Sequence, residues 1–225
     1  MFSYKLTALV LALLLGLPAV SVIANDTDEE DLPVLINDRL QVIETSIPVT
    51  VKAETAAVLA ETAKSAILID SGSGTVLYEK NSHERLAPAS ITKIMTMLLT
   101  LEAIDQGRIA LKDEITISQR AASMGGSQMY MEQGEQQAVE TLLKGMAIGS
   151  ANDACVACAE YVAGTEEIFI EMMNKRAREL GMEDTNFVNT NGLPAADHYT
   201  SAYDIGLMSK ELLKHKIAHE WFNTW

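Results

Sequence analysis

The sequence predicts a folded domain of mixed α and β class, α/β in the broad sense and α+β in detail, in which a β-hairpin precedes a set of helices. Two short apolar runs, 66–70 and 75–79, flank the turn Ser71-Gly72-Ser73-Gly74, and such a pair is typical of a hairpin. Apolar residues then recur at helical spacing over 139–147. The chain has 225 residues, 48% of them apolar, which is enough for one domain with a substantial core.

The first 24 residues have the composition of a secretory signal peptide. Lys5 supplies the positive start, an apolar run follows to Leu17, and Val22-Ile23-Ala24 resembles a cleavage site. An uncleaved membrane anchor is the alternative, since the apolar stretch is nearly long enough to span a bilayer, but Pro18 and Ser21 interrupt it. Both interpretations predict that the domain is exported through the cytoplasmic membrane. It would then lie in the periplasm or on the outer face of that membrane.

Residues 25–64 predict an N-terminal extension or tether. They begin with an acidic patch at 26–31 and lead into an Ala-rich piece at 53–63, and they contain no recognisable chemistry. The whole chain has a formal net charge of -14, so it repels phosphate backbones, and nucleic-acid binding is the least favoured function. We expect the folded domain to cover 65–225.

A nucleophile and a base stand one turn apart where the first helix begins. The hairpin leads into Pro88-Ala89-Ser90-Ile91-Thr92-Lys93, and in a helix that begins near Ser90 the Lys93 amine lies against the Ser90 hydroxyl. Burial lowers the pKa of a lysine and lets its amine accept the serine proton. The first turn of a helix also offers free backbone N–H groups to an oxyanion. Alone, this short pattern of common residues favours an ordinary helix start with an exposed lysine.

The helices after Ser90 are predicted from apolar spacing and from their end signals. The first should be central, buried and stopped by Gly107; a short strand at 114–117 and a Gly-rich loop at 124–134 follow. Later helices are expected before Gly149, over 154–163, from the cap Thr165 to Gly181, and over about 201–214, with a loop at 185–194.

A second group of polar residues lies between two of these helices, at Ser150-Ala151-Asn152. A tight connection can direct both side chains into a cleft, whereas inside a helix they would point in different directions. Ser-x-x-Lys, a Ser-Asp-Asn type element and Lys-Thr-Gly together form the signature of penicillin-binding proteins and class A β-lactamases. The first two elements are present here, and Lys-Thr-Gly does not occur in the 225 residues.

Two other pairs of residues are weaker candidates for a functional site than the two groups above. Cys155 and Cys158 fit a redox pair or two small buried residues, and we favour burial because no thioredoxin-like βαβ pattern surrounds them. His215 and His219 lie one turn apart beside Glu220, but the order differs from His-Glu-x-x-His, so we interpret them as surface histidines and predict no metal site.

From about Ala63 onward the sequence resembles the serine-type D-alanyl-D-alanine carboxypeptidases, the low-molecular-mass penicillin-binding proteins of peptidase family S11. Besides the two elements above, the similar stretches are Ile69-Asp70 with 74–81, Gly181-Met182 with Thr185-x-Phe187-x-Asn189, and Gly192-Leu193-Pro194. Class A β-lactamase is the nearest rival, but no Glu-x-x-Leu-Asn follows Ser150. The resemblance implies an α-β-α sandwich, in which helices cover a mostly antiparallel sheet.

The resemblance also implies roles for four residues. Ser90 would attack the penultimate D-Ala carbonyl of a peptidoglycan stem peptide, Lys93 would accept its proton, Ser150 would relay a proton to the leaving amine, and Asn152 would bind the substrate amide. β-Lactams would acylate Ser90, and no metal or cofactor is implied.

Without Lys-Thr-Gly, we expect the chain to lack C-terminal strands of the sheet and to be catalytically impaired as it stands. Membrane association through an uncleaved N-terminus or a C-terminal anchor is the accompanying expectation. The alternative function is a non-catalytic envelope fragment that at most binds stem peptide or a β-lactam.

Overall fold

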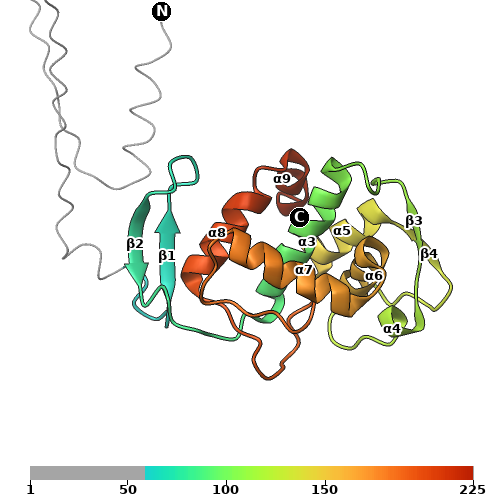
Figure 1. The fold of residues 1–225 in the computed structure, drawn as a ribbon, viewed down its shortest axis with the longest axis horizontal. Helices are drawn as coiled ribbons and strands as arrows, with labels where there is room; N and C mark the ends of the chain where they lie inside the picture. The colour runs from blue at the N-terminus through green and yellow to red at the C-terminus, as the bar shows by residue number, and fades with distance from the viewer. Residues whose placement is uncertain (1–58, 225) are drawn as a thin grey trace, which may run out of the picture. The chain divides into compact units, whose positions relative to one another are not determined.

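The structure, a computed structural model, describes residues 59–224 (Figure 1). The predicted signal peptide and residues 25–58 of the predicted extension lie outside the described residues. In chain order the elements are β1 (Ala66–Ile69), β2 (Val76–Lys80), the 3-10 helix η1 (Ala89–Thr92), α3 (Lys93–Asp105), β3 (Glu114–Thr116), α4 (Gln119–Ala122), β4 (Gln136–Ala138), α5 (Val139–Gly149), α6 (Asn152–Ala163), α7 (Glu166–Glu179), α8 (Ala202–Leu212) and α9 (Lys216–Phe222).

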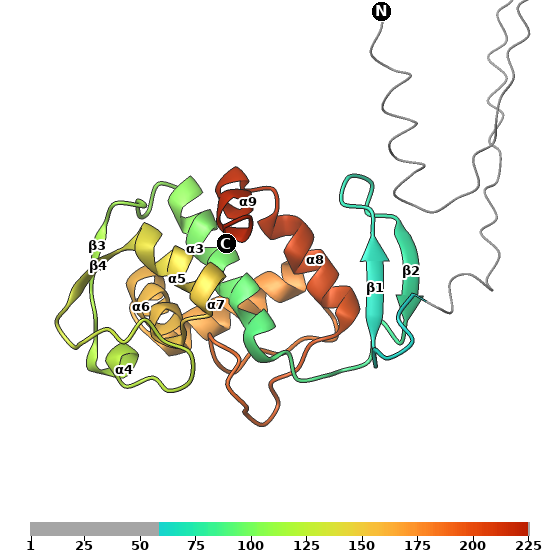
Figure 2. The same ribbon diagram turned by 180° about the vertical axis from the view of Figure 1, so that it is seen from behind.

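The predicted hairpin is confirmed as an antiparallel pair of β1 and β2, with Ala66 opposite Lys80 and Leu68 opposite Tyr78. Asp70 shapes its turn, because the Asp70 carboxylate accepts hydrogen bonds from both the backbone N–H and the hydroxyl of Ser73. One face of β1 packs on α8 so closely that a Cβ at Gly206 would lie 2.6 Å from Ile69. The two views show the hairpin beside α8 (Figures 1 and 2).

Helix α3 is the centre of the core, as predicted. It contacts α5, α6, α7 and α8, and nine of its 13 residues are buried. Helix α6 is buried over its first eight residues, 152–159, because Ala and Cys side chains are small enough to let neighbouring helices approach. The elements that carry Ser90, Lys93 and Asn152 are therefore supported by the best-packed part of the described chain.

A second two-stranded sheet, β3 with β4, lies on the side of the helices away from the hairpin (Figures 1 and 2). Only Ile115 of β3 is buried. The described part of the chain is thus mostly helical with two small sheets, which corresponds in part to the predicted sandwich.

Three predictions differ from the structure. Ser90 lies in η1 and not in an α-helix, because Ala89 has a left-handed φ of 47° and the chain tightens before α3 begins at Lys93. Helix α9 was not predicted, since Lys214-His215 breaks the apolar pattern after α8. His215 is not a surface residue: its side chain is only 14% exposed and its Nδ1 lies 3.2 Å from Asp105.

Packing on α5 gives a stability prediction. Leu142 is fully buried and Ile148 is 54% exposed on the same helix, so Leu142→Ala should lower the free energy of unfolding by about 2–5 kcal/mol. Ile148→Ala should lower it by no more than about 0.5 kcal/mol. Urea unfolding of both variants measures the difference, and equal losses would contradict the arrangement of α5.

Candidate active site

Ser90 and Lys93 are in contact, as the sequence predicts. The Lys93 amine lies 3.1 Å from the Ser90 hydroxyl and 2.7 Å from the backbone carbonyl of Asn191. Lys93 is 2% exposed, whereas Ser90 is exposed. A neutral amine in this position can donate to the Asn191 carbonyl and keep its lone pair for the Ser90 proton.

The surroundings of Lys93 favour that neutral amine. Burial lowers the pKa of Lys93, and a charge on the Cys155 thiol would oppose this effect. Burial, however, raises the pKa of Cys155 to about 12, so the thiol is uncharged near neutral pH. Cys155 therefore contributes low polarity and no compensating charge. Cys155 and Cys158 are both buried and free, as predicted.

Ser150 ends α5 in a left-handed conformation, with a φ of 55°. This conformation is uncommon for a residue other than glycine and indicates a local constraint. The Ser150 hydroxyl is buried and makes no hydrogen bond within residues 59–224. A buried hydroxyl without a partner is costly, so this group is available to a partner that enters the site.

Asn152 begins α6 and attaches the 124–134 loop to it. Its side-chain amide donates to the Gly125 carbonyl at 2.7 Å, and its backbone N–H donates to the Ser127 carbonyl. The buried carboxylate of Asp153 accepts a hydrogen bond from the backbone N–H of Met129. The tight connection predicted between α5 and α6 is confirmed, and its first helical residue is Asn152.

Close contacts at two glycines bring the Ser90 and Asn152 regions together. A Cβ at Gly126 would lie 2.8 Å from the Asn152 amide nitrogen and 3.8 Å from Leu193. Gly192, which directly precedes Leu193, contacts the Ala89 carbonyl. Ser90, Lys93 and Asn152 therefore surround one region formed by η1, the 124–134 loop and the 189–193 turn.

Sequence reasoning missed the polar groups that hold the 189–193 turn. The Glu166 carboxylate, on a residue only 7% exposed, accepts hydrogen bonds from Arg120 and from Thr190. The Thr190 carbonyl accepts from the Thr96 hydroxyl. Only the pair Asn191-Gly192 signalled a turn here, and nothing in the sequence indicated that its carbonyl would reach Lys93.

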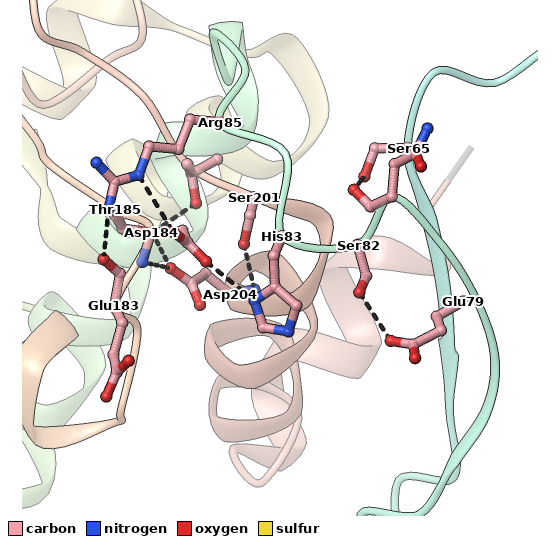
Figure 3. Close-up of polar contacts among 12 residues, drawn as sticks. Ser65, Glu79, Ser82, His83, Arg85, Glu183, Asp184, Thr185, Ser201 and Asp204 are labelled. Carbon is pink, nitrogen blue, oxygen red and sulfur yellow. Dashed lines mark hydrogen bonds and ion pairs between the residues drawn. The ribbon is translucent and has the colours of Figure 1, made fainter.

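A polar cluster anchors the segment that runs from β2 to Ser90 (Figure 3). Asp184 pairs with His83 at 2.9 Å and with Arg85 at 3.1 Å. The hydrogen bond from His83, followed by those from Arg85, holds the pKa of Asp184 below its usual value. Asp204 accepts from Thr185 and from the Asp184 N–H, while burial raises its pKa. This cluster fixes the approach to η1 without touching Ser90.

Other sites are not indicated in the part of the chain that the structure describes. Within residues 59–224 no group of His, Cys, Asp and Glu side chains is arranged to hold a metal ion. His219 contacts the Leu213 carbonyl. None of the helices in this range is both long and apolar enough to cross a membrane.

The family model for peptidase S11, D-alanyl-D-alanine carboxypeptidase, matches residues 50–224. The chain belongs to this family. The D-alanyl-D-alanine carboxypeptidase DacF of Bacillus subtilis is 54% identical over 167 residues, which cover 74% of this chain and 43% of the relative.

Solved structures of the family share the fold. The D-alanyl-D-alanine carboxypeptidase DacD of Francisella tularensis is 38% identical with a TM-score of 0.70, over 72% of this chain and 39% of that one. Penicillin-binding protein D2 of Listeria monocytogenes in its ampicillin-bound form is 28% identical with a TM-score of 0.60, over 68% and 62%. The described residues therefore have the penicillin-binding protein fold, and the chain spans about two-fifths of the length of the first two relatives.

The buried amine gives a pH prediction. The unfolded chain keeps the Lys93 proton up to about pH 10.5, and the folded chain releases it at a lower pH. Between these values the unfolded state binds more protons, so the free energy of unfolding rises with pH. From neutral pH towards 10.5, the parent should gain stability relative to Lys93→Met. Urea unfolding across this range measures the difference, and parallel curves would contradict a lowered pKa.

Proposed function

We propose that this chain carries the acylation machinery of a serine D-Ala-D-Ala carboxypeptidase, which removes the terminal D-Ala from peptidoglycan stem peptides. The observation that carries the proposal is the contact between the exposed Ser90 hydroxyl and the buried Lys93 amine. Membership of the S11 family supports the substrate class. The pair combines a nucleophile that substrate can reach with a base that burial keeps neutral.

Acylation begins with transfer of the Ser90 proton to Lys93 while the Ser90 oxygen bonds to the penultimate D-Ala carbonyl carbon. The tetrahedral intermediate collapses when the C–N bond breaks, and the leaving amine of D-Ala takes up a proton. Water then attacks the ester and regenerates the Ser90 hydroxyl. In this proposal the backbone N–H of Ser90, in the first turn of η1, donates to the oxyanion of both intermediates.

Ser150 and Asn152 complete the site in this proposal. The unpartnered Ser150 hydroxyl relays the proton from Lys93 to the leaving amine, which explains why it stays buried without a partner among residues 59–224. Gly125 already holds the Asn152 amide nitrogen, so the side-chain oxygen of Asn152 is the atom that accepts a hydrogen bond from the substrate's backbone amide. No step requires a metal or an organic cofactor.

β-Lactams are the expected inhibitors, because their strained amide resembles the acyl-D-Ala bond and Ser90 would open it. The ampicillin-bound Listeria protein supports this expectation. The proposed substrate is the peptidoglycan stem peptide of the cell envelope. This agrees with a chain that residues 1–24 direct to the periplasm or to the outer face of the cytoplasmic membrane.

In the described part of the chain, the hairpin of β1 and β2 has an uncovered apolar face, which bears on the complete fold. Ile67 and Ile69 face α8, yet Leu68 is 50% and Leu77 62% exposed. A hairpin that is apolar on both faces is typical of a sheet covered on both sides. This supports the α-β-α sandwich, with 65–225 as the catalytic domain and with further strands outside residues 59–224. An element equivalent to Lys-Thr-Gly would belong to such a strand.

Ser90→Ala tests the nucleophile. In the complete product of the gene that encodes these residues, this variant should lose covalent labelling by a fluorescent penicillin, because within residues 59–224 Ser90 is the hydroxyl that contacts Lys93. Ser123→Ala is the matched control, since the Ser123 hydroxyl donates to the Arg120 carbonyl, away from Lys93. Labelling that survives in Ser90→Ala would place the nucleophile elsewhere.

Lys93→Arg tests the base. Arginine stays protonated, so acylation should fall below detection while circular dichroism shows a folded protein. Lys144→Arg is the control, because Lys144 is a half-exposed partner of Glu140 and its replacement should leave the rate unchanged. Acylation by Lys93→Arg at the parent rate would remove Lys93 from the mechanism. Binding of penicillin without acylation in the parent itself would favour the non-catalytic alternative.

A further inference from the structure

The peptide group before Ser90 is strained and held from two sides. Ala89 has a φ of 47°, a conformation that costs energy in a residue with a Cβ. Its carbonyl accepts a hydrogen bond from the Thr92 hydroxyl at 2.8 Å. Gly192 approaches the same carbonyl so closely that an added Cβ would lie 1.8 Å from the oxygen. The strained conformation therefore persists because its surroundings fix it.

The Thr92 hydroxyl is itself oriented by His198. The two groups are 2.8 Å apart, and both residues are buried. The Val188 backbone N–H donates to His198 Nδ1 at 3.1 Å, so Nδ1 is an acceptor and the proton of the neutral ring lies on Nε2. Nε2–H then donates to Thr92, and the Thr92 proton is directed at the Ala89 carbonyl.

The direction of this carbonyl decides the direction of the Ser90 N–H. A trans peptide group is planar, so its N–H points opposite to its C=O. The hydrogen bond from Thr92 draws the Ala89 carbonyl towards the buried side of η1, and the Ser90 N–H consequently points away from it. If the Ala89–Ser90 peptide plane rotated, the Ser90 N–H would point in the wrong direction, even with the Ser90 hydroxyl and Lys93 in place.

We propose that His198 and Thr92 are positioning residues which, through the Ala89 carbonyl, aim the Ser90 N–H at the oxyanion formed during acylation. The inference rests on the proposed function, which gives neither residue a role. Burial lowers the pKa of His198, which agrees with a neutral ring that accepts from Val188 and donates to Thr92.

The test compares three threonine variants of the complete gene product. Thr92→Val removes the hydroxyl with little change of shape, and Thr92→Ser keeps it. Thr100→Val is the matched control, because Thr100 is equally buried and donates to the Thr96 carbonyl, one helical turn earlier. Stopped-flow acylation by a chromogenic penicillin gives the acylation rate constant and the non-covalent dissociation constant separately, and thermal melting reports stability.

We expect Thr92→Val to lower the acylation rate constant by about 10- to 100-fold, since losing an oxyanion donor outright costs about 10² to 10³. The non-covalent dissociation constant should stay unchanged, and Thr92→Ser should restore most of the rate. Thr100→Val should lower the melting temperature about as much as Thr92→Val does, without lowering the acylation rate constant. Should Thr92→Val not fold, His198→Phe interrupts the same hydrogen bonds and carries the same expectation.

The inference would be overturned if Thr92→Val kept the acylation rate constant of the parent, or if Thr100→Val lost as much of it as Thr92→Val. Either result would leave the proposed function intact. Labelling that survives in Ser90→Ala would refute the proposed function, and this inference with it.

Discussion

The burial of one lysine amine is the constraint on which the described structure depends. An amine works as a base near neutral pH only when its charged form is disfavoured, and here α3 places Lys93 in the core with a residue exposure of 2%. Its nitrogen must still have a partner, which the Asn191 carbonyl supplies. The 189–193 turn therefore has to be as rigid as the helix it contacts, and the buried Glu166 and Thr190 hydrogen bond provides that rigidity.

Several features of the site are unfavourable for stability and persist because the core supports them. Ala89 and Ser150 adopt left-handed conformations, and each costs of order 1–3 kcal/mol. The Ser150 hydroxyl is buried without a partner among residues 59–224, and Lys93 is buried as a potential cation. Ala89 directly precedes Ser90, and the Lys93 amine contacts the Ser90 hydroxyl, so two of these costs fall beside the proposed nucleophile. Strain next to a reacting group is expected where pre-organisation matters more than stability.

The sequence was most informative where a short-range rule acts. The hairpin followed from its Gly-rich turn, the helix ends followed from Gly107, Gly149 and Gly181, and the Ser90 to Lys93 contact followed from their spacing. Contacts between distant segments could not be predicted, because Lys93 and Asn191 lie 98 residues apart and His198 reaches Thr92 over 106. The 3-10 start of the first helix was missed for the same reason: propensity alone does not show that Gly192 and Thr92 hold Ala89 in its conformation.

These long-range contacts explain why the two motifs act only as part of one fold. Ser90 and Lys93 are local neighbours, but the neutral amine requires the 189–193 turn, and the direction of the Ala89 carbonyl requires Gly192 and the buried ring of His198. Asn152 is joined to the same turn through Gly126 and Leu193. The 189–193 turn thus contacts Lys93, Ala89 and the 124–134 loop, although it contributes to the proposed chemistry only a backbone carbonyl. A displacement of this turn would change the base, the oxyanion donor and the substrate contact together, so its sequence is constrained by geometry even where no side chain reacts.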